Sequence, residues 1–162
     1  WRRVACRART AAASGRILQS SRRKLCSVVP SLRTCEELLQ ENVGCDFAVE
    51  ADELVMDAAV IFANQDVGSL IVRRRDTWIG TISKRDVITF CVVRGADAEE
   101  YYVEDAFTPR DEITVVRPDS TLEEAVATMR TNGDNEVVVE VEGNASKILS
   151  ARDLAEALIV SS

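Results

Sequence analysis

Between residues 46 and 92, hydrophobic residues occur in two patterns: short continuous runs, and a spacing of three or four positions. Short apolar runs bounded by polar residues have the length and composition of strands, and Arg75, Asp76 and Thr77 form a polar turn between two of them. One stretch instead places apolar residues three or four positions apart, as on one face of a helix. The expected elements are strands at 46–49, 69–73 and 78–83 and helices at 54–64 (apolar face Val55, Ala58, Ala59, Phe62) and 85–92.

The same series of elements recurs later in the chain. Residues 52–88 align with residues 119–155 without a gap, at a constant offset of 67 positions (52 to 119). A repeat at fixed spacing predicts two copies of one structural unit. Ser120 and Glu123 have the spacing of a capping box, with Ser120 as the N-cap of the second copy's first helix. The expected elements are strands at 113–116, 137–141 and 147–150, a helix with Leu122, Ala125, Val126 and Met129 on one face, and a helix ending near Ile159.

One segment carries a family signature. Residues 80–86 read Gly-Thr-Ile-Ser-Lys-Arg-Asp, which has the form Gly-x-x-(Ser/Thr)-x-x-Asp, and residues 147–153 match this form except that lysine replaces the glycine. Together with the repeated helix starts, this pattern resembles the CBS domain, named after cystathionine β-synthase. The resemblance implies an α/β (α+β) fold of tandem CBS domains, two β-α-β-β-α repeats packed as a pseudo-twofold disc (a Bateman module). It divides the chain into a basic N-terminal segment (1–31), CBS domain 1 (32–95) and CBS domain 2 (96–160).

The resemblance also implies a ligand site in the cleft between the repeats. Ser83 and Asp86, with Gly80, would form one adenosine-nucleotide site, and Ser150 and Asp153 the other. Such ligands are AMP, ADP, ATP or S-adenosylmethionine, and no cofactor is required. A carboxylate can accept hydrogen bonds from a ribose diol, and the N–H groups at a helix start favour phosphate. Gly80 would let the backbone approach the ligand, and the base would lie against apolar residues such as Ala48, Val67 and Leu70.

A purely structural interpretation stays open. Serine is a common N-cap, and aspartate in the first turn interacts favourably with the helix dipole. The second copy also departs from the signature, because Lys147 stands in place of glycine and Glu136, Glu140 and Glu142 add negative charge. Charge of that sign opposes a polyphosphate. We therefore expect Asp86 to matter more than Asp153 for any bound nucleotide.

Charge is segregated along the chain. Nine basic residues and no acidic one occur through Thr34, whereas the remainder holds 11 basic and 27 acidic residues, a net charge of −16. The acidic remainder is unsuited to nucleic acid. A leader rich in Arg, Ser and Ala is typical of a mitochondrial or plastid transit peptide, and the predominance of arginine favours mitochondria. The alternatives are a disordered basic tail or one that binds nucleic acid.

Several kinds of chemistry have no residues to support them. The chain has no histidine, which excludes a Ser-His-Asp or Cys-His site formed by this chain alone. It has no phosphate-binding loop and no metal-ligand pattern. The five cysteines lack Cys-x-x-Cys spacing, so reduced thiols are expected, with a bridge from Cys26 to a partner as the alternative. The apolar runs are too short to span a membrane, so membrane association would be indirect. We expect a protein that is not an enzyme.

Two functional classes follow from these observations. The first is a non-catalytic accessory or regulatory subunit of a larger mitochondrial assembly such as a respiratory-chain complex, located in the matrix or on the matrix side of the inner membrane. Residues 1–31 would contact other subunits, because a segment with so few apolar residues cannot fold alone. The second is a stand-alone adenosine-nucleotide sensor that regulates an enzyme, with a CBS-mediated dimer as its form. A mitochondrial ribosomal subunit would suit the leader but not the acidic remainder.

Overall fold

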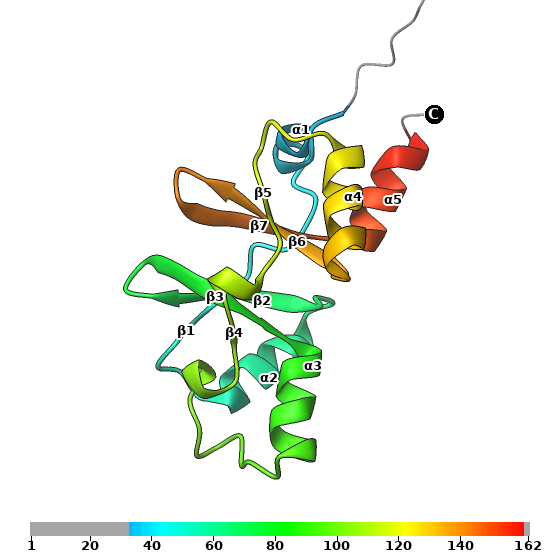
Figure 1. Ribbon diagram of the computed structural model, residues 1–162. Coiled ribbons are helices and arrows are strands. Elements are labelled where there is room, and N and C mark those ends of the chain that lie inside the picture. The colour runs from blue at the N-terminus through cyan, green and yellow to red at the C-terminus, as the bar shows by residue number, and fades with distance from the viewer. Residues whose placement is uncertain (1–32, 161–162) are drawn as a thin grey trace, which may run out of the picture. The chain divides into compact units, whose positions relative to one another are not determined.

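The computed structural model describes residues 33–160, which lie within one compact unit, Ser31–Ser162. The segment 1–31 lies outside the described residues, and so do the predictions that concern it. Two β-α-β-β-α repeats follow each other, as predicted, and in each the two helices lie side by side on the sheet (Figure 1). The first consists of β1 (Ala48–Glu50), α2 (Val55–Asn64), β2 (Ser69–Arg74), β3 (Thr77–Ser83) and α3 (Lys84–Ile88), and the second of β5 (Val115–Val116), α4 (Leu122–Asn132), β6 (Glu136–Val141), β7 (Asn144–Ser150) and α5 (Ala151–Val160).

The two repeats share one topology and one register. β1 pairs in parallel with β2, and Ala48 lies opposite Ile71. β5 pairs in parallel with β6, and Val115 lies opposite Val138, so the offset of 67 positions (48 to 115, and 71 to 138) is kept. In both antiparallel pairs the register shifts at the same place, after Val72 in β2 and after Val139 in β6. The strand orders β1-β2-β3 and β5-β6-β7 confirm the predicted pseudosymmetry.

The hairpin turns are one residue shorter than predicted. Arg75 and Asp76 have φ of 51° and 65°, and Glu142 and Gly143 have φ of 49° and 85°. Two successive residues with positive φ form the turn whose twist matches that of the flanking strands. The third predicted turn residue of the first hairpin, Thr77, is therefore the first residue of β3, and the corresponding Asn144 is the first residue of β7.

The helix starts also differ by one residue from expectation. The N-cap of α4 is Thr121 rather than Ser120: its hydroxyl accepts a hydrogen bond from the Glu124 N–H at 3.2 Å, and the Glu124 carboxylate accepts one from the Thr121 N–H at 3.0 Å. The predicted pairing of Ser120 with Glu123 was thus one residue early. The predicted helix at 85–92 is α3 followed by a π-helical turn, Thr89–Val93.

The strands are buried on both faces, which explains their continuous apolar runs. Leu70 and Val72 on β2 pack beneath the helices of the first repeat, and Val137 and Val139 on β6 do the same in the second. The intervening residues face the other sheet. This central layer between the repeats contains Ile71, Trp78, Val138, Ala145 and Ile148.

The segment before each repeat completes the core of the other repeat. Cys35 and Leu38 on α1 (Cys35–Gln40) are fully buried against the second repeat, and Val103 is buried in the core of the first. β4 (Thr108–Pro109) pairs with β3, so the first sheet has four strands instead of the predicted three. The helix faces agree with prediction except that Val126 is 37% exposed. The division of the chain at residue 95 stays a prediction.

Candidate functional site

The two Ser-x-x-Asp loops have the same geometry. The Asp86 carboxylate oxygen Oδ2 accepts hydrogen bonds from the Ser83 N–H at 2.8 Å and from the Ser83 hydroxyl at 2.6 Å, and the Asp86 N–H donates to Ser83 Oγ at 3.2 Å. Ser150 and Asp153 repeat these three bonds at the same distances. Each loop is therefore a capping box at the junction of a strand and a helix.

The first N–H of each helix is also bound within the protein. Lys84 N–H donates to the Gly68 carbonyl at 3.0 Å, and Ala151 N–H donates to the Asn135 carbonyl at 2.9 Å. Two of the first three N–H groups of α3 and of α5 thus have partners in the chain. The loops are held rigidly, but the helix starts offer a phosphate fewer free donors than the resemblance implies.

Ser83 and Asp86 line a cavity that we call the first cleft. Its volume is about 520 Å³, and residues of both repeats contribute to its walls. Within the described part of the chain, Lys84 and Arg85 add two positive charges, whereas four carboxylates line the same space. They belong to Asp86, Glu112, Asp134 and Glu136. The Asp134 carboxylate is already bound by the hydroxyl of Thr114, a buried residue.

Ser150 and Asp153 line the corresponding second cleft, of about 410 Å³. Its only cation among the described residues is Arg152, which forms an ion pair with Glu156 at 2.8 Å. The carboxylates of this cleft belong to Asp66, Glu136, Asp153 and Glu156. The second cleft therefore carries more uncompensated negative charge than the first.

Three of the described residues line both clefts: Gly68, Ser69 and Glu136. The Ser69 side chain is hydrogen-bonded to the Glu136 carboxylate. Glu136 lies over Gly68, since a Cβ built at Gly68 would be 2.6 Å from Glu136 Oε1. Burial raises the pKa of Glu136, and the nearby Asp86 and Asp153 raise it further, while the Ser69 hydrogen bond lowers it. One carboxylate thus lies within reach of both Ser-x-x-Asp loops.

In the structure, glycine at position 80 is explained by packing within the chain and not by the approach of a ligand. Gly80 lines neither cleft, and a Cβ at this position would lie 2.2 Å from the Thr108 carbonyl oxygen and 2.6 Å from the Phe107 ring. The groups that come close to Gly80 therefore belong to β4 and to the residue before it. At the corresponding place in the second repeat, Lys147 is buried, and its ammonium donates to the Asn42 side-chain oxygen at 2.6 Å.

The residues expected to hold a base are dispersed. Leu70 is fully buried in the core of the first repeat, so no ligand in the clefts can contact it. Val67 lines the second cleft, and Ala48 packs against the layer between the sheets. The residues expected from the sequence did not include Ser69, Thr81 and Thr114, which line the first cleft. The repeat could have indicated Ser69, because it is the counterpart of Glu136 (69 to 136).

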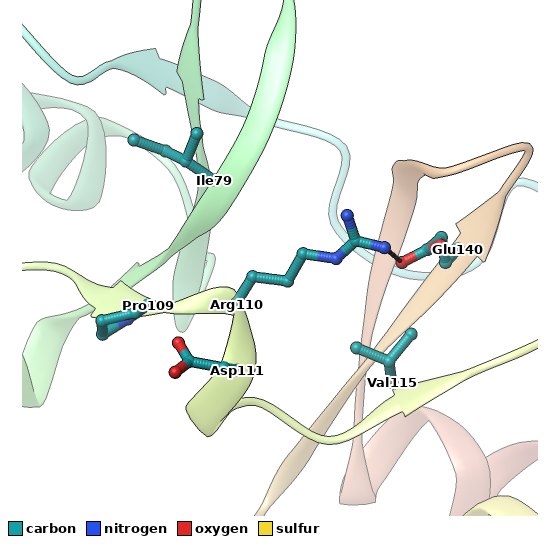
Figure 2. Close-up of a pocket in the computed structure, with 6 residues that line it drawn as sticks. All are labelled: Ile79, Pro109, Arg110, Asp111, Val115 and Glu140. Carbon is teal, nitrogen blue, oxygen red and sulfur yellow. Dashed lines mark hydrogen bonds and ion pairs between the residues drawn. The ribbon is translucent and has the colours of Figure 1, made fainter.

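A further cavity, of about 500 Å³, lies away from both Ser-x-x-Asp loops and is lined by six residues. Arg110 extends across it from the segment after β4 to an ion pair with Glu140 on β6 (Figure 2). The Arg110 guanidinium also lies 4.8 Å from the ring centroid of Trp78. These contacts link the connecting segment to both sheets, so this cavity is best explained by the packing of the repeats.

The described residues hold few groups suited to other chemistry. No cluster of three or more His, Cys, Asp or Glu side chains among them could hold a metal ion. None of the helices in residues 33–160 combines the length and apolar composition needed to cross a membrane. Cys35 and Cys45 are free thiols, and burial raises the pKa of each. Raised pKa values make these thiols weaker nucleophiles at neutral pH.

Comparisons with known proteins agree with the fold. Residues 103–160 match the model of the CBS domain family. A protein with CBS domains from Burkholderia ambifaria is 22% identical with a TM-score of 0.71, over 79% of this chain and 95% of that one. A CBS-domain protein from Agrobacterium tumefaciens is 22% identical with a TM-score of 0.66, over 78% of this chain and 99% of the other.

A third solved structure, the hexameric CBS-CP12 protein from bloom-forming cyanobacteria, is 18% identical with a TM-score of 0.66. That similarity covers 78% of this chain and 68% of the cyanobacterial one. At identities this low, the structural similarity establishes the fold alone. No curated protein sequence matches the chain. The second repeat is thus a CBS domain, and the described residues have the fold of tandem CBS-domain proteins.

Proposed function

We propose that this CBS-domain protein is a non-catalytic regulatory module that binds an adenosine-containing ligand in the clefts between its two repeats. One observation carries the proposal: the same Ser-x-x-Asp loop occurs twice, and each copy opens onto a cavity lined by both repeats. CBS domains often bind adenine nucleotides in a regulatory role, and that property of the matched family supports the same use here. Ligand bound between two repeats can couple its presence to their arrangement.

The capping geometry is compatible with ligand binding. The hydrogen bonds of each cap use only Oδ2 of the aspartate, so within the described residues Oδ1 remains available to the hydroxyls of a ribose. The first cleft is the better candidate because it is larger and holds Lys84 and Arg85. In the second cleft Arg152 is already paired with Glu156.

Calorimetric titration of the full chain with adenosine and its derivatives tests the proposal. Asp86→Asn keeps an oxygen that can accept the hydrogen bonds of the cap but removes the charge that strengthens a bond to ribose. We expect this variant to weaken binding about tenfold, Asp153→Asn to weaken it less, and Asp76→Asn to leave it unchanged. Asp76 is a matched control because it lies in an exposed turn outside both clefts.

Absence of binding by the unmodified chain at millimolar ligand would overturn this function. Equal affinities in the chain and in both cleft variants would place the ligand elsewhere. In either case the two loops would be capping devices alone, which is the structural interpretation that their hydrogen bonds already satisfy.

We further propose that the module serves as an accessory subunit of a mitochondrial assembly, namely a respiratory-chain complex on the matrix side of the inner membrane. The segregated charge supports this role, because nine basic residues and no acidic one precede Cys35. A segment of that composition cannot bury enough apolar surface to fold alone. Acidic surfaces of other subunits, reached through residues 1–31, would supply its partners.

Deleting residues 1–30, with an independent mitochondrial targeting signal supplied, tests this second role. We expect the truncated protein to fold but to be lost from large complexes on native gels, where the full chain co-migrates with them. A truncated protein that still co-migrates would show that the repeats dock by themselves. A full chain that runs only as a small free dimer would overturn the assembly role and favour a stand-alone sensor.

A further inference from the structure

The pseudosymmetry of the two repeats is broken by charge where the clefts meet. β2 begins with Ser69, and β6 begins with Glu136 at the corresponding position (69 to 136). Ser69 is buried, and its side chain is hydrogen-bonded to the Glu136 carboxylate. Because this carboxylate lines both clefts, either ligand position faces it.

The surrounding charges do not neutralise Glu136. Among residues 33–160, the first cleft has four carboxylates against two cations, and the second has four against one. The two aspartates that act on Glu136 electrostatically are Asp86 and Asp153, the same residues that would hold the ribose. A ligand held by either aspartate would therefore bring its 5′ group into a region of negative potential.

The helix starts do little to offset this potential. In α3 and in α5 the first N–H and the N–H of the aspartate are bound to oxygens of the chain itself. Lys84 and Arg85 are exposed at the first cleft, so solvent and salt screen their attraction for a phosphate. Partly buried Glu136 is screened less.

We infer that Glu136 selects the charge of the ligand, so that the clefts accept an adenosine derivative with a neutral or cationic 5′ group and discriminate against nucleoside 5′-phosphates. This inference rests on the proposed function and narrows it to one class of ligand. Glu136 repels an anionic 5′ group and attracts a cationic one, whereas a serine in its place, as at the corresponding Ser69, would do neither.

Three probes that differ only at the 5′ position test the inference by calorimetry on the full chain: 5′-amino-5′-deoxyadenosine, adenosine and AMP. We expect the affinity to fall in that order. Glu136→Gln keeps the shape of the side chain and an oxygen for the Ser69 hydrogen bond but removes the charge. In this variant we expect AMP to bind about tenfold more tightly and the amino derivative about tenfold more weakly, with adenosine unchanged. Glu123→Gln, on the exposed side of α4, is the matched control and leaves all three affinities unchanged.

The outcomes separate this inference from the function on which it rests. If AMP binds the unmodified chain as tightly as adenosine does, or if Glu136→Gln leaves their ratio unchanged, charge selection is overturned while adenosine binding stands. If none of the probes binds either the unmodified chain or Glu136→Gln, the proposed function fails and the inference fails with it. If only Glu136→Gln binds AMP, Glu136 is confirmed as the residue that excludes phosphate.

Discussion

Removing either capping aspartate is expected to destabilise the fold by a similar amount. Asp86→Ala and Asp153→Ala each remove a carboxylate whose Oδ2 accepts two hydrogen bonds from the serine three residues earlier, at 2.8 and 2.6 Å. A hydrogen bond to a charged group contributes about 1.5–3 kcal/mol, and an N-cap contributes about 1 kcal/mol. Both loops are partly exposed, so water replaces some of the lost bonds. We therefore expect a loss of about 2 kcal/mol in each variant.

The corresponding thermal shift follows from the size of the folded unit. An unfolding entropy of about 2.1 cal/mol/K per residue, over roughly 130 residues, makes 2 kcal/mol equivalent to a decrease in Tm of about 7 °C. Urea denaturation followed by circular dichroism measures the free energy, and calorimetry measures Tm. Asp86→Asn and Asp153→Asn, which keep an acceptor, are the controls and should lose less than half as much. A loss below about 0.5 kcal/mol in either alanine variant, or a large difference between the two, would refute the shared capping geometry.

Two further predictions concern stability. Gly80→Ala should lower the free energy of unfolding by about 1–3 kcal/mol, because its Cβ would lie 2.2 Å from the Thr108 carbonyl oxygen and displace β4; an unchanged urea midpoint would contradict this packing. Burial, together with Asp86 and Asp153, raises the pKa of Glu136 in the folded chain. The folded chain therefore binds this proton more tightly than the unfolded chain, and the resulting gain in the free energy of unfolding is complete below about pH 4 and is lost as the pH rises through the raised pKa. Glu136→Gln should therefore gain stability relative to the unmodified chain as the pH rises above about 4, and parallel pH profiles of the two urea midpoints would disprove this.

The fold was predictable because the same physical pattern is present twice. Apolar strands, a helix with one buried face and a polar turn recur at a fixed offset, and the structure keeps that offset in strand pairing and in the register shifts. What the pattern could not predict involves contacts between repeats. β4 exists because Thr108 and Pro109 meet the edge of β3, and α1 is stabilised by a core formed more than 70 residues later in the chain. Neither feature has a local periodic signal.

The site was predictable only at its anchoring loops. Ser83, Asp86, Ser150 and Asp153 line the two clefts, but their hydrogen bonds also explain them as caps. The signature suggested that Gly80 lets the backbone approach a ligand closely, whereas in the structure Thr108 and Phe107 occupy the space beside Gly80. The sequence placed Glu136 near one site. Its contact with both clefts depends on how the starts of β2 and β6 meet, which no linear spacing reveals.

The central claim is that an adenosine-containing ligand binds in the clefts between the repeats. Mapping the amide chemical shifts of the ¹⁵N-labelled full chain during titration with adenosine tests it most directly. The account predicts saturable shifts at Gly68, Ser69, Asp86 and Glu136, with the largest around the first cleft, and little change along the exposed faces of α2 and α4. Absence of saturable shifts, or shifts confined to surfaces outside both clefts, would contradict it.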